Sequence, residues 1–463
     1  MVKGAGEATA AGADAVRLTV HHECCLENGS PALLDALRAA LTIDNPRYQD
    51  AKRFGRWIGK KLKPQLFFFR EEKGRFFFPR GFGNRAVRLC RQHAGVSPQL
   101  VDERRLLPPI DLTFQGTLRP YQETAVAAVL AHSFGVLEAS TGSGKTVMAL
   151  AVLARRSQPT LVLVHTRELM QQWRERIRQF LGIEAGQAGD GKVELQPVTV
   201  AIVNTARKHL DTLVPLFGQL VVDECHRVPA SLFTEVVAAF DCHYMLGLSA
   251  TAFRREDGMT RLIHISMGDR VHAVDGRMLE ASGAVVRPVL EQRPTAFVRN
   301  FQGEYARLIK ALAEDSRRNR QIATDVAALV HRGHQGTVLV VSDRVAHCQA
   351  LADLLVADGV AAAVLTGQST PDQRLQVVEA VQAGRVPVLV ATLQLIGEGF
   401  DCPDLSTLVL ATPIRFEGRL LQVVGRIMRP AEGKKALVID YVDVGIPVLG
   451  RSAAARREVF AAW

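Results

Sequence analysis

The sequence lacks any apolar stretch long enough to cross a membrane. A membrane-spanning helix needs about 20 predominantly apolar residues, and runs such as LVLV and VLVV end after a few positions. The first twenty residues carry Glu7, Asp14 and Arg17, whereas a secretory signal has an uninterrupted apolar centre. We therefore expect a cytoplasmic protein that has no membrane partner.

Paired cysteines are also missing. The seven cysteines are an odd number, and no two of them stand in a C-x-x-C pair, so neither a disulfide framework nor a zinc ribbon is indicated. Hydrophobic residues make up 48% and charged residues 22% of the 463 residues. This composition and length are typical of a folded chain with more than one domain.

The positive charge is concentrated in one segment. The net charge is +10 for the whole chain, and residues 44–91 contain 14 Lys or Arg against 4 Asp or Glu, together with ten aromatic residues. Cationic side chains neutralise phosphates and aromatic rings stack on bases, so we expect this surface to contact nucleic acid. The stretch QLFFFREEKGRFFFP also fits a hairpin whose six phenylalanines fill a small core, and both interpretations can hold together.

Three regions follow one another along the chain. Residues 1–111 form the basic, aromatic-rich region, which ends in the proline-marked LLPPID. In residues 112–295 and again in 296–463, short Val/Leu/Ile-rich runs alternate with amphipathic stretches, a pattern typical of parallel sheets covered by helices. We predict an α/β chain with two tandem parallel-sheet domains behind a small N-terminal α+β accessory domain.

The stretch LEASTGSGKT, residues 137–146, predicts a phosphate-binding loop between a strand and a helix. Successive backbone N–H groups and the helix N-terminus bind phosphates in such loops, and Gly142 and Gly144 permit close backbone approach. Lys145 is predicted to reach the β- and γ-phosphates and Thr146 to bind Mg²⁺. Ala139 stands where the general pattern has a glycine, which is sterically acceptable at a negative φ. We therefore expect ATP and Mg²⁺ as cofactors.

Two further motifs complete the predicted chemistry. LVVDECHRVP places Asp223 and Glu224 at the end of an apolar strand, where Asp223 is assigned to the metal ion and Glu224 to the general base. LLQVVGRIMRP has Gln422, Arg426 and Arg429 at a spacing that lies on one face of a helix. Because the phosphate loop supplies only a lysine, we assign the two arginines to the charge that develops on the γ-phosphate.

Taken together, these motifs resemble those of superfamily 2 helicases of the DExH type, closest to the XPB/UvsW-like branch, whose motor also resembles the Res subunit of type III restriction enzymes. The resemblance covers Leu118 to about Asp443, and some eight motifs follow in the family's order. It implies two RecA-like domains, ATP hydrolysis with Mg²⁺, and movement on DNA, duplex or branched, with little sequence preference. Ala139 is the usual residue at its position in this superfamily.

The resemblance also implies roles for individual residues. LRPYQETAV, STGSGKT, VHTRELMQQW, VDECHRVP, GLSATAFRREDG, LVATLQLIGEGFDCPD and QVVGRIMRP carry them. The residues implied to bind the nucleotide are Arg119, Gln122, Thr141, Gly142, Ser143, Gly144, Lys145, Thr146, Gly399 and Asp401. The residues implied to contact the nucleic-acid strand are Thr166, Arg167 and Thr392. The residues implied to couple ATP turnover to movement are His226, Ser249, Thr251, Arg255, Glu256 and Asp257.

Other partners stay open at this point. TRELMQQ is widely shared among RNA helicases, so an RNA-dependent ATPase is an alternative, and a nucleic-acid clamp or defence-system subunit switched by ATP without unwinding is another. Archaeal motors of this branch pair with nucleases, and no nuclease signature is recognised in the chain, so a separate nuclease partner is conceivable.

Overall fold

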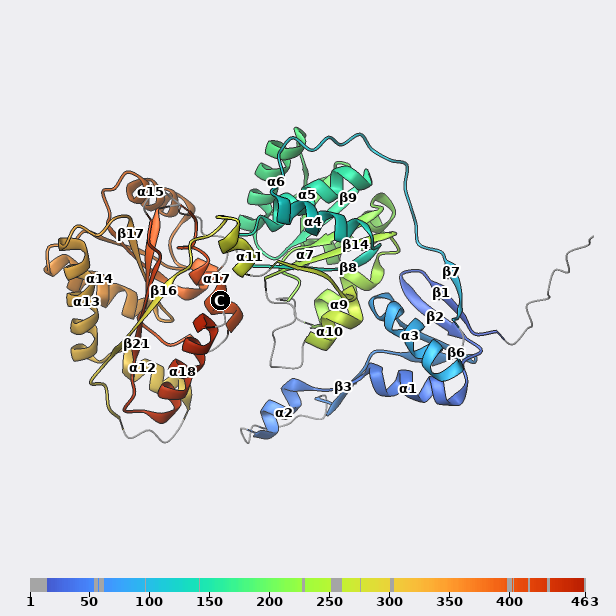
Figure 1. Ribbon diagram of the computed structural model, residues 1–463, viewed down its shortest axis with the longest axis horizontal. Helices are drawn as coiled ribbons and strands as arrows, with labels where there is room; N and C mark the ends of the chain where they lie inside the picture. The colour runs from blue at the N-terminus through green and yellow to red at the C-terminus, as the bar shows by residue number, and fades with distance from the viewer. Residues whose placement is uncertain are drawn as a thin grey trace, which may run out of the picture. The chain divides into compact units, whose positions relative to one another are not determined.

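The computed structural model describes residues 15–53, 57, 62–95, 97–140, 142–226, 230–250, 260–274, 276–299, 304–397, 402, 404–414, 417–430 and 434–461. By their internal contacts these residues form two compact units (Figure 1). The first unit comprises Met1–Leu118, Glu123–Glu138 and Thr146–Ala273, and the second Arg119–Gln122, Ala139–Lys145 and Val274–Trp463. The three-domain division at residues 111 and 295 stays a prediction.

The N-terminal part of the first unit is an α+β layer. Its five-stranded sheet has the order β5-β6-β2-β1-β7, and β3 and β4 form a separate antiparallel pair. The elements of the layer are β1 (Arg17–Val20), β2 (Glu23–Glu27), α1 (Pro31–Leu41), β3 (Thr42–Asp44), α2 (Pro46–Arg53), β4 (Gln65–Phe67), β5 (Arg70–Glu72), β6 (Arg75–Pro79), η1 (Arg80–Phe82), α3 (Gly83–Ala94) and β7 (Gln99–Asp102).

The predicted phenylalanine hairpin forms in this layer. Strands β5 and β6 are antiparallel and are joined through Lys73 and Gly74, both with positive φ. Because side chains alternate along a strand, Phe76 and Phe78 enter the core, each 1% exposed. Phe67, however, is 57% exposed. The prediction that all six phenylalanines fill the core is therefore wrong for Phe67, which belongs to the two-stranded ribbon, and for Phe77, which lies outside this core under the Arg70 guanidinium.

The N-terminal layer packs directly on the helix α10 (Thr260–Met267) of the following sheet domain. Leu262 and Ile265 of α10 belong to the hydrophobic core of the layer. At the contact, a Cβ on Gly81 would lie 2.6 Å from the carbonyl oxygen of Ile265, so only glycine allows this close approach. The layer and the following domain are thus parts of one packed body.

The eight-stranded sheet of the first unit has the order β11-β10-β12-β9-β13-β14-β8-β15. The six strands from β10 to β8 in this order are parallel to their neighbours, as the alternating sequence pattern predicts. The strands are β8 (Phe134–Ala139), β9 (Thr160–Val164), β10 (Gly186–Gly189), β11 (Lys192–Glu194), β12 (Val198–Ile202), β13 (Gln219–Val222), β14 (Tyr244–Ser249) and β15 (Arg270–Val274). The helices of this region are α4 (Pro120–Leu130), α5 (Lys145–Arg156), α6 (Arg167–Leu181), α7 (Val203–Lys208), α8 (Leu210–Leu213), η2 (Val214–Leu216), α9 (Ala230–Ala239) and α10.

The six-stranded sheet of the second unit is parallel throughout, in the order β16-β21-β20-β17-β19-β18. Helices α13 and α14 cover one of its faces, where their apolar side chains share a core with β17 (Figure 1). The strands are β16 (Val289–Pro294), β17 (Thr337–Ser342), β18 (Ala362–Leu365), β19 (Val388–Thr392), β20 (Leu405–Leu410) and β21 (Leu437–Val442). The helices are α11 (Gly276–Ala281), α12 (Tyr305–Ala313), α13 (Ser316–His331), α14 (Val345–Ala357), α15 (Pro371–Gln382), α16 (Leu393–Gly397), α17 (Glu417–Val424) and α18 (Pro447–Ala461).

Two parallel-sheet domains therefore follow the N-terminal layer, as predicted. Within the described ranges, no helix combines the length and the apolar character that crossing a bilayer requires.

Candidate functional site

The predicted phosphate loop connects the end of β8 to the start of α5. Ala139 closes the strand in extended conformation, and Lys145 is the first residue of the helix. Gly142 and Gly144 have φ of +87° and +79°, values that residues with a Cβ rarely adopt. The backbone N–H of Ser143 donates to the carbonyl of Ser140 at 3.1 Å. The local geometry is thus that of a tight turn leading into a helix N-terminus.

Two residues at the start of α4 donate hydrogen bonds to the same carbonyl oxygen of this loop. The amide Nε2 of Gln122 donates to the carbonyl oxygen of Ser143 at 3.0 Å, and the hydroxyl of Tyr121 donates to the same oxygen at 2.9 Å. The other end of the Gln122 side chain accepts from the backbone N–H of Arg119 at 2.9 Å. Burial raises the pKa of Tyr121, which keeps its hydroxyl a donor. Gln122 therefore links the predicted base-binding segment to the predicted phosphate loop.

Asp223 follows the last residue of β13 and is 7% exposed. Its two carboxylate oxygens accept hydrogen bonds from different donors, since the indole Nε1 of Trp173 lies 2.8 Å from Oδ2 and the backbone N–H of Glu224 lies 2.9 Å from Oδ1. Donors on both oxygens fix the orientation of the carboxylate. Strands β13 and β8 are both parallel to β14, which lies between them, so their carboxyl ends share one edge of the sheet.

Glu224 has a left-handed backbone, with φ of +47°. Non-glycine residues adopt this conformation rarely, and such residues cluster at functional sites. Its Oε2 lies 3.3 Å from Nδ1 of His226. The same His226 nitrogen lies 2.7 Å from the hydroxyl of Ser249, the last residue of β14. A short polar chain thus runs from the predicted general base to the end of the neighbouring strand.

The metal assignment fits the chemistry of these residues. Mg²⁺ prefers oxygen ligands and is commonly held by one or two carboxylates, a hydroxyl and substrate phosphates. Asp223 offers an oriented, largely buried carboxylate, and Thr146 is a half-buried hydroxyl residue in the first turn of α5. No group of three or more His, Cys, Asp or Glu that could hold a metal ion forms among the residues with described positions.

In the second unit, Thr392 ends β19 and is 7% exposed, and Gln422 in α17 is 6% exposed. The prediction that Gln422, Arg426 and Arg429 share one helical face is wrong, because α17 ends at Val424. The chain tightens there: the N–H groups of Arg426 and Ile427 donate to carbonyls three residues back, at 3.1 and 3.0 Å. Both arginines are half-buried and follow the helix instead of lying along it.

The surroundings of Arg429 are electropositive. Burial lowers the pKa of Lys434, and the positive charge of Arg429 lowers it further, against the attraction of Asp404. The Lys434 ammonium makes no hydrogen bond with any described residue. A cationic pair of this kind stabilises a bound anion.

Two of the residues predicted to contact the nucleic-acid strand also stabilise the local structure of the protein. The Thr166 hydroxyl is the N-cap of α6, accepting from the N–H of Leu169 at 3.2 Å, and Arg167 forms an ion pair with Asp190 while its side chain stays 59% exposed. The predicted residues Thr141, Thr251, Arg255, Glu256, Asp257, Gly399 and Asp401 lie outside the described residues.

Sequence reasoning missed Tyr121 and Trp173. Each stands inside a quoted motif, LRPYQETAV or VHTRELMQQW, but an aromatic residue in an amphipathic segment is as readily a core residue. Only the positions of the Ser143 carbonyl and the Asp223 carboxylate show that the hydroxyl and the indole N–H have specific partners.

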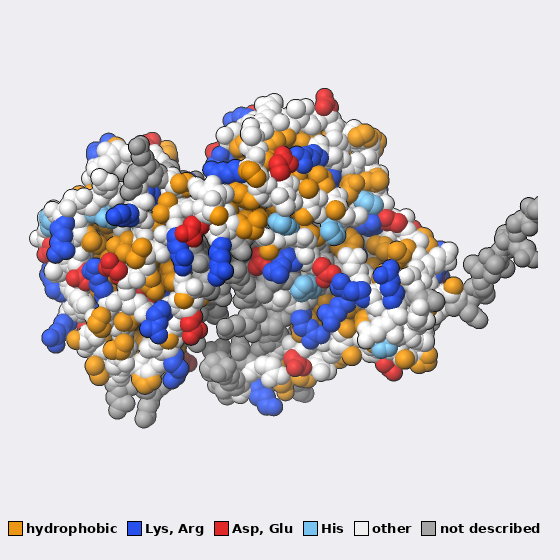
Figure 2. Space-filling model, in the orientation of Figure 1, with side chains coloured by type: hydrophobic (Ala, Val, Ile, Leu, Met, Phe, Trp, Pro, Cys, Tyr) orange, Lys and Arg blue, Asp and Glu red, His pale blue; other side chains and the backbone are white. Residues whose placement is uncertain are grey.

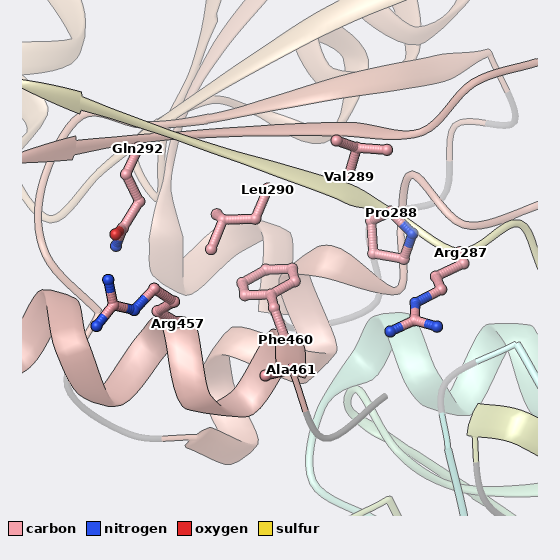
Figure 3. A pocket seen from close by; sticks show the side chains of 8 residues that line it. All are labelled: Arg287, Pro288, Val289, Leu290, Gln292, Arg457, Phe460 and Ala461. Carbon is pink, nitrogen blue, oxygen red and sulfur yellow. The ribbon is translucent and has the colours of Figure 1, made fainter.

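A cavity of about 630 Å³ in the second unit lies elsewhere (Figure 3). It opens between β16 and the end of α18, with the Phe460 ring beside Leu290 and the guanidinium groups of Arg287 and Arg457 on either side. None of the predicted site residues lines it, so it has no part in the nucleotide site.

Comparisons with known proteins agree with this geometry. The family model described as the res subunit of type III restriction enzymes matches residues 115–254, and the helicase conserved C-terminal domain matches residues 321–431. Probable helicase D10 of Escherichia phage T5 is 28% identical over 376 residues, which cover 79% of this chain and 80% of that protein. The DNA 3'-5' translocase XPB2 of Sulfurisphaera tokodaii is 26% identical over 372 residues, covering 71% of this chain and 82% of that protein.

The solved structure of S. cerevisiae Dbp5 bound to RNA and ADP BeF3 matches with a TM-score of 0.54 at 17% identity, over 74% of this chain and 87% of that chain. This likeness concerns the fold alone, and it confirms the two RecA-like domains. The chain belongs to the superfamily 2 helicases of the XPB/Res type. It is accordingly an ATP-hydrolysing enzyme, as the motifs predicted.

Proposed function

We propose that this helicase is a DNA translocase that couples Mg-ATP hydrolysis to movement on, or unwinding of, duplex or branched DNA. The observation that carries the proposal is the bond between His226 and Ser249 at 2.7 Å. It joins the segment that contains Asp223 and Glu224 to Ser249, which ends β14 and is the first residue of the predicted coupling motif. The names of relatives as DNA 3'-5' translocases or helicases support DNA as the substrate and that polarity.

We assign the steps of hydrolysis to named residues. Lys145 and the backbone of the phosphate loop bind the β- and γ-phosphates. Thr146 and Asp223 would hold Mg²⁺, and the bound ion would neutralise part of the phosphate charge. Glu224 accepts a proton from the attacking water. Arg426 and Arg429 stabilise the charge on the γ-phosphate, and Gln122 with Arg119 recognises the base. Gly399 and Asp401 complete the nucleotide contacts.

The described geometry supports parts of this assignment. The positive φ of Gly142 and Gly144 gives the loop a tight turn into the N-terminus of α5, the kind of terminus at which phosphates bind. The Trp173 indole holds the Asp223 carboxylate in one orientation, so little reorganisation is needed when a cation binds. The N–H of Glu224 is already bonded to Asp223, which couples the metal ligand to the base.

The N-terminal layer is proposed to add nucleic-acid affinity. On the face that Figure 2 shows, Lys and Arg side chains gather over α3, which carries Arg85, Arg88 and Arg91 with exposed side chains. Phosphate contacts carry little sequence information, so binding should be nearly independent of sequence and strongly reduced by salt. Thr166, Arg167 and Thr392 are the proposed strand contacts of the motor itself.

The test is a panel of ATP hydrolysis rates with duplex DNA, single-stranded DNA and RNA, each at two salt concentrations. Stimulation by DNA that falls with salt is expected, and stimulation by RNA alone would overturn the DNA assignment. Robust hydrolysis without strand displacement or translocation would instead indicate an ATP-switched clamp. Co-purification with a nuclease would support the separate nuclease partner that the resemblance to archaeal motors makes conceivable.

Glu224→Gln tests the general base. We expect turnover to fall by about a thousandfold or more while ATP binding persists, because the amide keeps the size of the carboxylate but accepts no proton. Glu175→Gln on the exposed face of α6 is the matched control. Normal hydrolysis by Glu224→Gln would show that another group activates the water.

A further inference from the structure

A second cavity, of about 290 Å³, lies in the first unit where the N-terminal layer meets the first RecA-like domain. Its wall includes Phe67, Phe68, Phe69, Phe77, Phe78 and Arg80, and we refer to it as the aromatic pocket. Helices α9 and α10 close it through Val237 and Ser266. The pocket therefore has aromatic walls from the accessory layer and a floor from the motor.

The rings of the pocket are held in place from behind. Phe69 stacks on the buried Phe76, with ring centroids 5.1 Å apart and planes 13° apart, and Phe67 meets Phe69 edge to face at 6.1 Å. The Arg70 guanidinium covers the Phe77 ring at 4.2 Å, and Glu23 fixes that guanidinium through both carboxylate oxygens. Phe67, at 57% exposed, is the ring most accessible to a ligand. Pre-positioned rings lose little conformational entropy when a flat ligand stacks on them.

Arg80 gives the pocket a polar and cationic wall. It is 2% exposed, and its terminal nitrogens donate to the Cys242 carbonyl at 2.6 Å and contact the Met245 sulfur at 3.2 Å. Its Nε makes no hydrogen bond with any described residue. Because the contacts with Cys242 and Met245 hold the guanidinium in place, Arg80 contributes a fixed positive charge to the pocket wall, which favours a ligand rich in electron-pair acceptors.

A flat aromatic ligand with hydrogen-bond acceptors fits this combination, and a nucleobase has both features. We propose that the aromatic pocket binds a single unpaired nucleobase, which stacks on the exposed Phe67 ring and is attracted by the positive charge of Arg80. The proposal rests on the proposed function, because it needs DNA at the N-terminal layer. The volume is close to the lower end of ligand pockets, about 300–1,000 Å³, which suits one base and excludes a stretch of strand.

The source of the base follows from its chemistry. A paired base is stacked inside the duplex and must leave it to enter a pocket, which costs least where the base is already unpaired. Branch points, bulges and gaps in DNA present such bases, whereas a regular duplex does not. The pocket would therefore add a preference for DNA with unpaired positions to an otherwise sequence-independent motor.

The experiment measures binding without ATP to three DNAs of equal length: a regular duplex, the same duplex with a one-nucleotide bulge, and the bulge with an abasic sugar in place of its nucleotide. We expect the full-length protein to bind the bulged duplex about tenfold more tightly than the other two. Tenfold corresponds to about 1.4 kcal/mol, within the range of base stacking on an aromatic side chain. Equal affinity for all three overturns the proposal.

Variants locate the effect. Phe67→Ala should remove the preference for the bulge and leave the affinity for regular duplex unchanged, whereas Phe67→Tyr should keep the preference because the ring stays. Leu100→Ala is the control, since Leu100 is an apolar residue of the same N-terminal layer, in β7, that is 61% exposed and does not line the pocket. A preference that survives Phe67→Ala overturns the proposal.

A second measurement places the base directly. With 5-iodouracil at the bulge, light-induced cross-links should map to residues 67–69 or 77–78, and cross-links exclusively elsewhere overturn the proposal. Competition by a free nucleoside would support recognition of the base itself, and its absence with the bulge preference intact would support recognition of the base within a strand. Failure to bind any of the DNAs would contradict the proposed function as well, whereas equal binding contradicts the pocket alone.

Discussion

His226 and Ser249 are joined by a hydrogen bond between the ring Nδ1 and the hydroxyl oxygen at 2.7 Å. The two residues follow or end neighbouring parallel strands, β13 and β14, and the same ring nitrogen lies 3.3 Å from Glu224. A change in the position of Glu224 on hydrolysis would alter the hydrogen bond that His226 makes to Ser249. The contact is therefore well placed to report the state of the nucleotide to the end of β14.

Replacing Ser249 by alanine tests this role. We expect ATP binding and basal hydrolysis to persist while the stimulation of hydrolysis by DNA falls by about tenfold, because loss of one such hydrogen bond costs about 1.5 kcal/mol. The measurement is the stimulation ratio, which is the hydrolysis rate with duplex DNA divided by the rate without it.

Ser342→Ala is the matched control for that variant. Ser342 also ends a strand and bonds a histidine, His347, at 2.9 Å, but it belongs to no motif assigned to coupling. It should lower stability without changing the stimulation ratio. Equal loss of stimulation in both variants would show that Ser249 acts through stability alone.

Trp173→Phe removes the indole donor to Asp223 and keeps an aromatic ring. Because Trp173 is 1% exposed and its N–H orients the carboxylate, we expect the Mg²⁺ concentration for half-maximal hydrolysis to rise by about tenfold, the lower range for loss of a residue that orients a metal ligand. A Mg²⁺ titration of the hydrolysis rate measures it. Trp57→Phe changes a tryptophan that is 90% exposed and should leave the titration unchanged; an identical shift there would contradict the assignment.

Arg318 and Asp443 form an ion pair at 2.8 Å with both side chains fully buried. Arg318→Leu would leave the Asp443 carboxylate without its cationic partner in the interior, so we expect a loss of about 3–5 kcal/mol in the free energy of unfolding of the second unit. Arg320→Leu, two residues further along α13, breaks a partly exposed pair with Asp358 and should cost at most about 1 kcal/mol. Urea denaturation of both variants measures the two losses in the free energy of unfolding. Similar losses for Arg318→Leu and Arg320→Leu would show that burial of the Arg318–Asp443 pair does not set its contribution to stability.

The local parts of the site could be predicted from the sequence, but the contacts between distant segments could not. The loop from Ala139 to Lys145 is predictable because small residues between an apolar run and an amphipathic run dictate a turn. By contrast, Trp173 and Asp223 are 50 residues apart and Arg318 and Asp443 are 125 apart, so only the packing of the sheets shows that each pair meets. The end of α17 at Val424 was missed for another reason: periodicity indicated a continuous helix, but glycine at 425 weakens it.

His347 predicts how stability depends on pH. Burial, with a contribution from Arg318, lowers the pKa of His347 to about 3, whereas a histidine in the unfolded chain has a pKa of about 6.5. Between these values the unfolded state binds a proton that the native state does not. The free energy of unfolding therefore falls as the pH falls below about 6.5, by up to about 1.4 kcal/mol per pH unit.

The variant His347→Gln isolates this contribution. Glutamine does not titrate and can still bond Ser342 or Asn319, the two partners of the ring. Between pH 7 and pH 5, the native protein should lose about 2 kcal/mol more than His347→Gln, measured by urea denaturation at each pH. His93→Gln, at an exposed position in α3, serves as the control and should follow the native curve. Parallel curves for the native protein and His347→Gln would show that His347 is not the group that titrates, because its removal would then leave the pH dependence unchanged.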